Sequence, residues 1–151
     1  MNLFFRDANL FDLEHITQML IDDQQGKKRE SQSSDACEKY ANAFEEICQD
    51  PNATVIVGCV DDEVIACAQL NFLRNLTYQG GLRAQIEGVR VRQDYRSQGV
   101  GRKLFDDLIK RAKERGCHLV QLTTDKARPD AFAFYESLGF LNTHAGFKLH
   151  F

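Results

Sequence analysis

Residues 82–116, LRAQIEGVRVRQDYRSQGVGRKLFDDLIKRAKERG, contain a strand, a glycine-rich loop and a long helix in direct succession. The pattern predicts a helix over residues 99–115, because apolar residues recur every three or four positions and charged residues fill most positions between them. Gly116 then provides a typical helix end. The apolar face of this helix consists of Val100, Leu104, Leu108 and Ala112.

The strand that precedes the loop has a slip in its alternation. Its first half is apolar at even positions and its second half at odd positions: Leu82, Ala84 and Ile86, then Val89 and Val91. Since strand side chains alternate with a period of two, the change of parity requires one extra residue. The sequence therefore predicts a β-bulge at Glu87 and Gly88, which would bend the strand and leave backbone groups unpaired. The alternative is a plain, partly exposed strand with irregular patterning.

Glu87 lies at this slip, and its environment is left open by the spacing. If its side chain points into the core region, burial would disfavour the ionised carboxylate and raise its pKa, so that it could act as a base near neutral pH. The alternative is a solvated glutamate on the outer face of the strand.

The loop Arg96 to Gly101, RSQGVG, opens the long helix. A helix N-terminus carries unpaired N–H groups and a partial positive charge, and glycines let those groups approach a phosphate closely. With Arg96 and Arg102 beside it, the loop is predicted to bind an anion. Two nucleotide motifs are excluded: Lys103 is followed by Leu104 rather than by Ser or Thr, and Leu104 stands where the dinucleotide motif needs a third glycine.

The bulk composition is that of a globular protein. The chain has 151 residues, 43% hydrophobic and 27% charged, which we interpret as a single domain over residues 1–151. A net charge of -3 disfavours nucleic acid as a partner. The N-terminus does not resemble a signal peptide, and no run is long enough to span a membrane, so no membrane association is expected. The five cysteines are scattered, which favours free thiols in a reducing cytoplasm over disulfides or a metal site: Cys37, Cys48, Cys59, Cys67 and Cys117.

The remaining elements are predicted from periodicity and turn residues. Helices are expected over residues 12–21, with Asp12 as N-cap, and over 40–48, 99–115 and 130–138. Strands are expected over residues 3–6, 53–60, 63–72, 85–92, 118–124 and 147–151. The polar stretch 22–35 is either a loop or the start of the second helix, and 75–81 is a loop. The hairpin 53–72 requires antiparallel strands and the strand–helix–strand unit 85–124 a parallel pair, so a mixed α/β sheet with helices on both faces is predicted.

Residues 85–140 resemble the GNAT superfamily of acetyl-coenzyme A-dependent N-acetyltransferases. The motifs that carry the resemblance are IEGVRV, RSQGVG, the long helix, LVQLTTD and DAFAFYESLGF. The elements outside this run follow the same order as in that fold. The resemblance implies an α/β (α+β) architecture with a mixed, mostly antiparallel sheet, splayed at a central parallel strand pair and covered by helices on both faces.

The resemblance also implies how acetyl-coenzyme A, the cosubstrate, would bind. The backbone of Val89 and Val91 would hold the pantetheine arm, and a backbone N–H near Val89 could stabilise the developing oxyanion. The pyrophosphate would lie on the backbone of seven consecutive residues: Arg96, Ser97, Gln98, Gly99, Val100, Gly101 and Arg102. Many members have an asparagine after the next strand, whereas this chain has DKARPDA. Asp125, Lys126 or Arg128 could replace that contact, unless the segment is a solvated loop.

Tyr135 matches the family's general acid, which protonates the leaving thiolate. The alternative is core packing beside Phe132, Phe134 and Leu138, but a tyrosine hydroxyl needs a polar partner. Glu87 matches a position that is often acidic in the family, which makes it the candidate base, acting through a water molecule.

The function that follows is transfer of an acetyl group from acetyl-coenzyme A to the primary amine of a small molecule, by direct attack through a tetrahedral intermediate. The alternatives are a non-catalytic acyl-coenzyme A-binding or regulatory module, and acetylation of a protein or a charged RNA. The acceptor site would be built from residues 22–35, residues 75–81 and the first helix. A homodimer is possible, since members of the family often form one.

Overall fold

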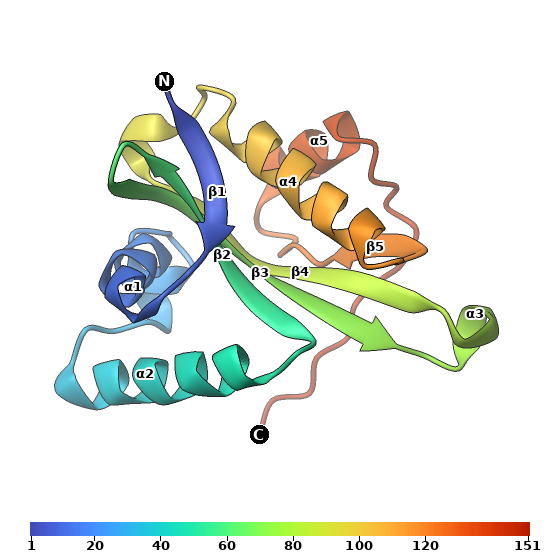
Figure 1. Cartoon of the computed structure of the whole chain (residues 1–151), viewed down its shortest axis with the longest axis horizontal. Coiled ribbons are helices and arrows are strands. Elements are labelled where there is room, and N and C mark those ends of the chain that lie inside the picture. The colour runs from blue at the N-terminus through green and yellow to red at the C-terminus, as the bar shows by residue number, and fades with distance from the viewer. The chain divides into compact units, whose positions relative to one another are not determined.

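The computed structural model describes all residues from Met1 to Phe151. Its five strands form one sheet in the order β1-β2-β3-β4-β5 (Figure 1), with antiparallel pairing from β1 to β4 and a parallel β4–β5 pair. The mixed, mostly antiparallel sheet is therefore confirmed. The strands are β1 Leu3–Asp7, β2 Ala53–Val60, β3 Glu63–Arg74, β4 Leu82–Val91 and β5 Leu119–Leu122.

The chain divides into two compact units, Met1–Gln121 and Leu122–Phe151. The first unit contains nearly the whole sheet, and the second contains helix α5, Pro129–Ser137. A single domain over residues 1–151 stays a prediction. No helix in the chain has the length and apolar composition needed to cross a membrane.

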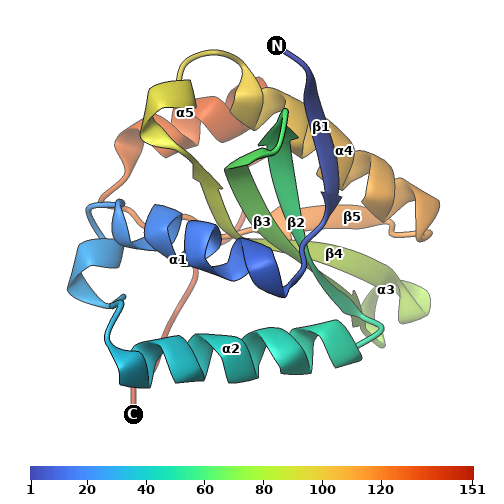
Figure 2. The ribbon, with the colours of Figure 1, turned by 60° about the vertical axis from the view of Figure 1, so that its left-hand side comes forward.

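Helices cover both faces of the sheet. Helices α1 (Leu13–Ile21) and α2 (Ser34–Gln49) lie on the near face in Figure 2, and α4 (Val100–Glu114) lies behind the sheet. Short helical segments join the longer elements: η1 Leu10–Asp12, η2 Gly26–Lys28, α3 Thr77–Gly80 and η3 Gln93–Tyr95. Helix α4 begins and ends within one residue of its predicted bounds, because its apolar spacing is strict and a glycine lies at each end.

Alternation along the strands supplies an apolar layer to each face. Helix α1 packs on one layer, where Ile16 and Met19 join Val57, Cys59 and Cys67 in a buried cluster. Helix α4 packs against β3 and β4 on the other face of the sheet, where the apolar side chains are equally well buried. On that side the most deeply buried residues include Ile56, Leu70, Ile86, Leu104, Phe105 and Leu108. Burial of side chains of this size stabilises the fold by about 1.5–3 kcal/mol each.

The start of the first helix differs from its prediction. Asn9 caps the short helix η1, where its side chain accepts from Phe11 N and Asp12 accepts from Asn9 N in a capping box. The Asp12 side chain makes no capping bond to α1. Its two oxygens instead accept hydrogen bonds from Arg6 at 2.7 and 2.9 Å.

The second helix begins six residues before its predicted start. Ser33 caps it by accepting from Ala36 N, and the first turns expose polar residues to solvent. Residues 34–39 therefore show no apolar period that sequence analysis could detect. Of the two predictions for the stretch 22–35, its last residues are the start of the helix and the rest is turn and loop.

The predicted strand over residues 147–151 does not form. Residues 140–151 have no regular secondary structure. Apolar and polar residues alternate over 147–151 as in a strand, but these residues pair with no strand of the sheet. Strand formation requires a partner, so the pattern alone could not produce one.

Candidate active site

The predicted β-bulge is present in β4. Cys67 of β3 lies opposite Arg90, and Gln69 lies opposite Glu87, so three steps along β4 match two steps along β3. Gly88 has φ +59°, and a Cβ built on it would meet no atom within 4 Å. A glycine in this left-handed conformation beside open space is what a bulge in a ligand-binding strand requires.

Beyond the bulge, the backbone N–H and C=O of Val91 face away from β3. Arg92 N donates to Ile65 O at 2.8 Å, so alternation turns the N–H and C=O of Val91 to the other side. On that side Arg96 Nε donates to Val91 O at 2.9 Å. Val89 has no residue of its own opposite it in β3, and its carbonyl accepts from Arg90 Nη1 at 2.8 Å.

Strand β5 accompanies only the first half of β4. His118 N donates to Leu82 O at 2.9 Å, which sets the start of β5 level with the start of β4. Since β5 ends at Leu122, four residues after His118, it reaches about as far as Ile86. The second half of β4, from the bulge to Val91, therefore continues beyond the end of β5. This gives the parallel pair the splayed form that the resemblance implied.

The bulge rests on the side chain of Cys67. Its Sγ lies 3.8 Å from Gly88 O, and burial raises the pKa of this thiol to about 12. Cys67 is 2% exposed. It is a packed, protonated thiol beneath the bulge rather than a nucleophile.

The glycine loop is held by bonds from its own side chains to nearby backbone. Gln98 Nε2 donates to Asp94 O at 2.7 Å, and Arg96 donates to β4 as described above. Ser97 and Gly99 have φ of +60° and +79°. Two left-handed residues within three positions turn the chain sharply from η3 into α4.

Helix α4 begins without a side-chain cap. Its N-cap is Gly99, and the first bond within the helix runs from Lys103 N to Gly99 O at 3.2 Å. The N–H groups of Val100 and Gly101 therefore have no carbonyl acceptor inside the helix. A Cβ at Gly99 would meet nothing within 4 Å, so a ligand can approach the backbone there. These features fit an anion, which would accept hydrogen bonds from both N–H groups and would be stabilised by the positive end of the helix dipole.

Glu87 lies on the exposed side of the sheet, so the solvated alternative is the observed one. A row of polar side chains ends at its carboxylate. Arg83 Nη1 donates to Gln121 Oε1 at 3.2 Å, Gln121 Nε2 to Gln85 Oε1 at 2.7 Å, and Gln85 Nε2 to Glu87 Oε1 at 2.6 Å. This row, which we call the amide relay, fixes the orientation of a carboxylate that stays open to water.

The amide relay was not predicted from the sequence. Gln85 lies two residues before Glu87 and therefore shares its face of β4, which was a detectable signal. Gln121 lies 36 residues further along the chain, and only the pairing of β5 with β4 brings it to Gln85.

An ion pair connects Arg90, next to the bulge, to the loop that follows α1. Arg90 Nη2 lies 3.5 Å from Asp23 Oδ2, with side chains 11% and 13% exposed. Asp23 also accepts from the N–H groups of Gln25 and Gly26, which shapes the loop. Part of the loop expected to contact the acceptor is thus attached to the strand expected to contact the cosubstrate.

Tyr135 belongs to the second compact unit and lies in α5. Its ring lies 5.5 Å from that of Phe134 and 6.2 Å from that of Phe140. Of the three neighbours named for core packing, Phe134 thus lies beside the ring, and no residue of α5 is fully buried. Within the segment 125–128, Asp125 accepts from Ala127 N and Arg128 N.

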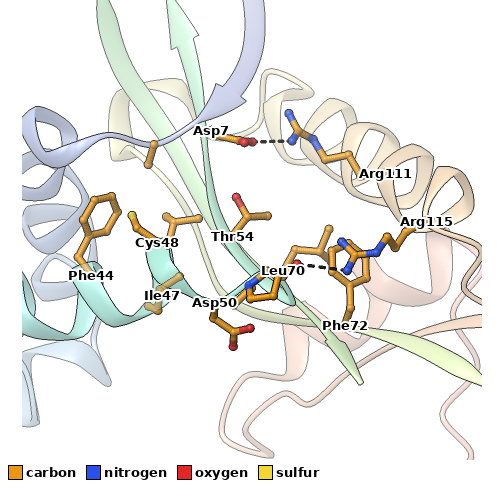
Figure 3. Close-up of a pocket in the computed structure, with 14 residues that line it drawn as sticks. Asp7, Phe44, Ile47, Cys48, Asp50, Thr54, Leu70, Phe72, Arg111 and Arg115 are labelled. Atoms are coloured by element: carbon orange, nitrogen blue, oxygen red, sulfur yellow. Dashed lines mark hydrogen bonds and ion pairs between the residues drawn. The ribbon is translucent and has the colours of Figure 1, made fainter. Parts of the chain in front are cut away.

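A pocket of about 420 Å³ lies elsewhere in the first unit (Figure 3). Phe44, Leu70 and Phe72 line its inner part, and Asp7, Arg111 and Arg115 stand at its rim. Arg111 pairs with Asp7 at 2.7 Å, while the Arg115 guanidinium lies 4.5 Å from the centre of the Phe72 ring. The pocket contains none of the predicted site residues. No cluster of three or more potential metal ligands occurs in the structure.

Comparison with known proteins gives a match to the acetyltransferase (GNAT) family over residues 14–140. A structure from Bacillus halodurans C-125, described as a transcriptional regulator, is 49% identical, covers 99% of this chain and 100% of its own, and superposes with a TM-score of 0.96. A putative acetyltransferase from Agrobacterium tumefaciens str. C58 is 27% identical, with 97% and 99% coverage and a TM-score of 0.85.

Two curated relatives match over shorter segments. Glucosamine 6-phosphate N-acetyltransferase of Trypanosoma brucei brucei is 35% identical over 78 residues, which are 51% of this chain and 50% of the relative. The [ribosomal protein bS18]-alanine N-acetyltransferase of Escherichia coli (strain K12) is 39% identical over 57 residues, 38% of each chain. The matches thus span half or less of these relatives' length.

The fold, the bulged strand before an uncapped glycine helix and the extent of the family match agree with one another. The chain belongs to the GNAT acetyltransferase family.

Proposed function

We propose that this protein transfers the acetyl group of acetyl-coenzyme A to a primary amine of a small molecule. The observation that carries the proposal is the uncapped N-terminus of α4 next to the bulge of β4. Open space at Gly88 and Gly99 gives a ligand access to the backbone at both places. A pyrophosphate on residues 96–102 and a pantetheine arm along Val89 and Val91 would use these two features together.

In this proposal Glu87 accepts, through a water molecule, the proton that the acceptor ammonium must lose before it can attack. The amine nitrogen then attacks the thioester carbonyl carbon, and a backbone N–H near Val89 stabilises the oxyanion. When the intermediate collapses, the carbon–sulfur bond breaks and the Tyr135 hydroxyl gives its proton to the thiolate. The amide nitrogen loses its second proton to solvent, and the proton taken up by Glu87 returns through solvent to the Tyr135 phenolate. The products are the acetylated amine, coenzyme A and a proton.

The exposure of Glu87 suits its role, because a base that works through water must be reached by water. The amide relay supports the same role, since its last donor holds one carboxylate oxygen and leaves the other available. The reducing cytoplasm is the compartment we infer, since all five cysteines are free thiols.

The proposal is tested by measuring the turnover of acetyl-coenzyme A with a panel of amines. The panel includes amino sugars, small primary amines and peptide N-termini. General acid–base groups contribute about 10²–10⁴-fold to a rate, so Tyr135→Phe and Glu87→Gln are each expected to reduce kcat by about 10²-fold or more. Tyr95→Phe is the matched control, because the Tyr95 ring stacks on Arg92 and has no part in the proposed chemistry. Unchanged kcat in both variants would contradict the assigned roles.

A second candidate is a non-catalytic module that binds acyl-coenzyme A and regulates another process. The description of the Bacillus halodurans structure as a transcriptional regulator favours it. Micromolar binding of acetyl-coenzyme A without turnover on any amine of the panel would support this candidate. Turnover confined to peptide N-termini would instead indicate a protein acceptor, as in the name of the Escherichia coli relative.

A further inference from the structure

Arg90 carries a nearly buried positive charge directly after the bulge of β4. Its side chain is 11% exposed, and the cost of removing a guanidinium from water is offset where its N–H groups find partners. Nη1 donates to the carbonyl of Val89 at 2.8 Å, and Nη2 lies 3.5 Å from Oδ2 of Asp23. One guanidinium thus connects the backbone of β4 to the loop after α1.

The same oxygen of Asp23 shapes that loop. Oδ2 accepts hydrogen bonds from Gly26 N at 3.0 Å and from Gln25 N at 3.2 Å. Gly26 is buried, and a Cβ on it would collide with the carbonyl oxygen of Leu20, so the loop lies directly against the end of α1. One carboxylate oxygen therefore serves both the loop and the Arg90 guanidinium, and the two move together while these contacts last.

The candidate base and the guanidinium share one face of β4. Gln69 of β3 lies opposite Glu87. Cys67, two residues earlier in β3 and thus on the same face, lies opposite Arg90. Cys67 also belongs to the buried cluster on which α1 packs. Glu87, Arg90 and the loop that Asp23 shapes are therefore on the same side of the sheet.

The thiol of Cys67 fixes the orientation of Val89. Its Sγ lies 3.8 Å from Gly88 O, so the Val89 N–H at the other side of that trans peptide points away from β3. Burial raises the pKa of the thiol, and a hydrogen bond from the Arg90 N–H opposes the rise, so this N–H also faces Cys67. The Val89 carbonyl, which is trans to it, points away from β3 as well. Val89 thus turns both its N–H and its C=O to the side that β3 leaves open.

The Arg90 guanidinium binds the Val89 carbonyl on this open side. A carbonyl oxygen without a donor would repel an oxyanion that develops beside it, whereas a hydrogen bond from a cation offsets its partial negative charge. The Val89 N–H is then the group left for the thioester oxygen. We propose that Asp23 is a positioning residue for acetyl transfer, which holds Arg90 on the Val89 carbonyl and so keeps the Val89 N–H directed at the thioester. The inference rests on the proposed function, in which a backbone N–H near Val89 stabilises the oxyanion.

Asp23→Asn separates the ion pair from the shape of the loop. The amide oxygen can still accept from Gln25 N and Gly26 N, but it has no charge with which to hold Arg90. We expect kcat to fall about tenfold per molecule that binds acetyl-coenzyme A in calorimetry, with both KM values within about twofold of wild type, because the lost interaction is one of the transition state. Asp22→Asn is the matched control and should keep the wild-type kcat, because it removes the same charge from an exposed neighbour that bonds to Gln18 in α1.

A double variant tests whether Asp23 acts through Arg90. Arg90→Met removes the donor to the Val89 carbonyl and should also lower kcat about tenfold. The double variant Asp23→Asn/Arg90→Met should be no more than about twofold slower than the slower single variant, since both changes break one unit. Independent effects would multiply to about 10²-fold and would overturn the inference.

Two further outcomes would also overturn it. One is a kcat of Asp23→Asn equal to that of Asp22→Asn. The other is a loss confined to the fraction of molecules that bind acetyl-coenzyme A, which would assign Asp23 a purely structural role. In both cases the wild type still turns over, so the proposed function stands. A wild type that binds acetyl-coenzyme A but acetylates no amine would refute the proposed function, and this inference with it.

Discussion

Asp12 shows how one side chain can connect a strand to the helical turn that follows it. It is the charged residue among the fully buried ones, at 4% exposure, and it joins β1 to the turn before α1. Two hydrogen bonds from Arg6 and one from Asn9 N satisfy its oxygens. The bonds from Arg6 lower the pKa of the Asp12 carboxyl below its ordinary value, although burial opposes the shift.

Because the folded-state pKa of Asp12 is lowered, its ionised form stabilises the fold above the unfolded pKa, and this contribution is lost as the pH falls through the folded pKa. Asp12→Asn should therefore reduce the free energy of unfolding by about 2 kcal/mol at neutral pH, the scale for hydrogen bonds to charged groups. The difference from wild type should shrink between about pH 5 and about pH 2. Urea unfolding across this range measures it.

Asp106→Asn is the control for that experiment, because Asp106 lies on the exposed face of α4. It should change the free energy of unfolding by no more than about 0.5 kcal/mol at any pH. A difference between wild type and Asp12→Asn that stays constant down to the acid limit would refute the assigned ionisation.

The β4 strand shows which features of an element a sequence can reveal. The bulge could be predicted because a change of parity at Glu87 and Gly88 has one simple geometric cause. Whether Glu87 is buried or exposed could not be predicted, since alternation near a bulge does not determine which face a side chain takes. The amide relay was out of reach for a similar reason, because it depends on which strand lies beside β4.

Gly88→Ala tests the conformation of the bulge. At φ +59° an alanine is strained by about 1–2 kcal/mol, and the added methyl meets no other atom, so backbone strain is the whole effect. The variant should lose about that much unfolding free energy in urea. Gly146→Ala is the matched control, as its methyl also meets nothing and its φ is not positive, and it should be neutral or slightly stabilising. Equal losses in both variants would contradict the strained bulge.

Helix α2 and residues 147–151 illustrate opposite errors in predicting structure from sequence patterns. The first turns of α2 were missed because they are solvent-exposed and capped by Ser33, so they need no apolar period. Residues 147–151 were predicted to form a strand because their alternation is regular, although a strand also needs a neighbour. Local sequence thus identified the shape that each segment favours, while tertiary contacts decided whether that shape formed.

At the level of the whole protein, the bulge and the glycine helix could be anticipated because their signals lie within residues 82–116. The mixed sheet could be anticipated because the hairpin 53–72 and the strand–helix–strand unit 85–124 are each continuous in sequence. The shape of the loop around Asp23 could not, since it depends on the ion pair with Arg90 in β4. The family assignment rests on features of the first kind.

The central claim is that the start of α4 binds the pyrophosphate of acetyl-coenzyme A. Calorimetric titration with acetyl-coenzyme A and with S-acetylpantetheine, which lacks the pyrophosphate, tests it most directly. Wild type should bind the whole molecule at least about tenfold more tightly, a difference of about 1.4 kcal/mol, and Gly99→Ala should lose most of this preference. Gly116→Ala carries a similar backbone strain at the other end of α4, with φ +84°, and should retain it. Equal affinity of the wild type for the two ligands, or equal behaviour of the two variants, would contradict the account.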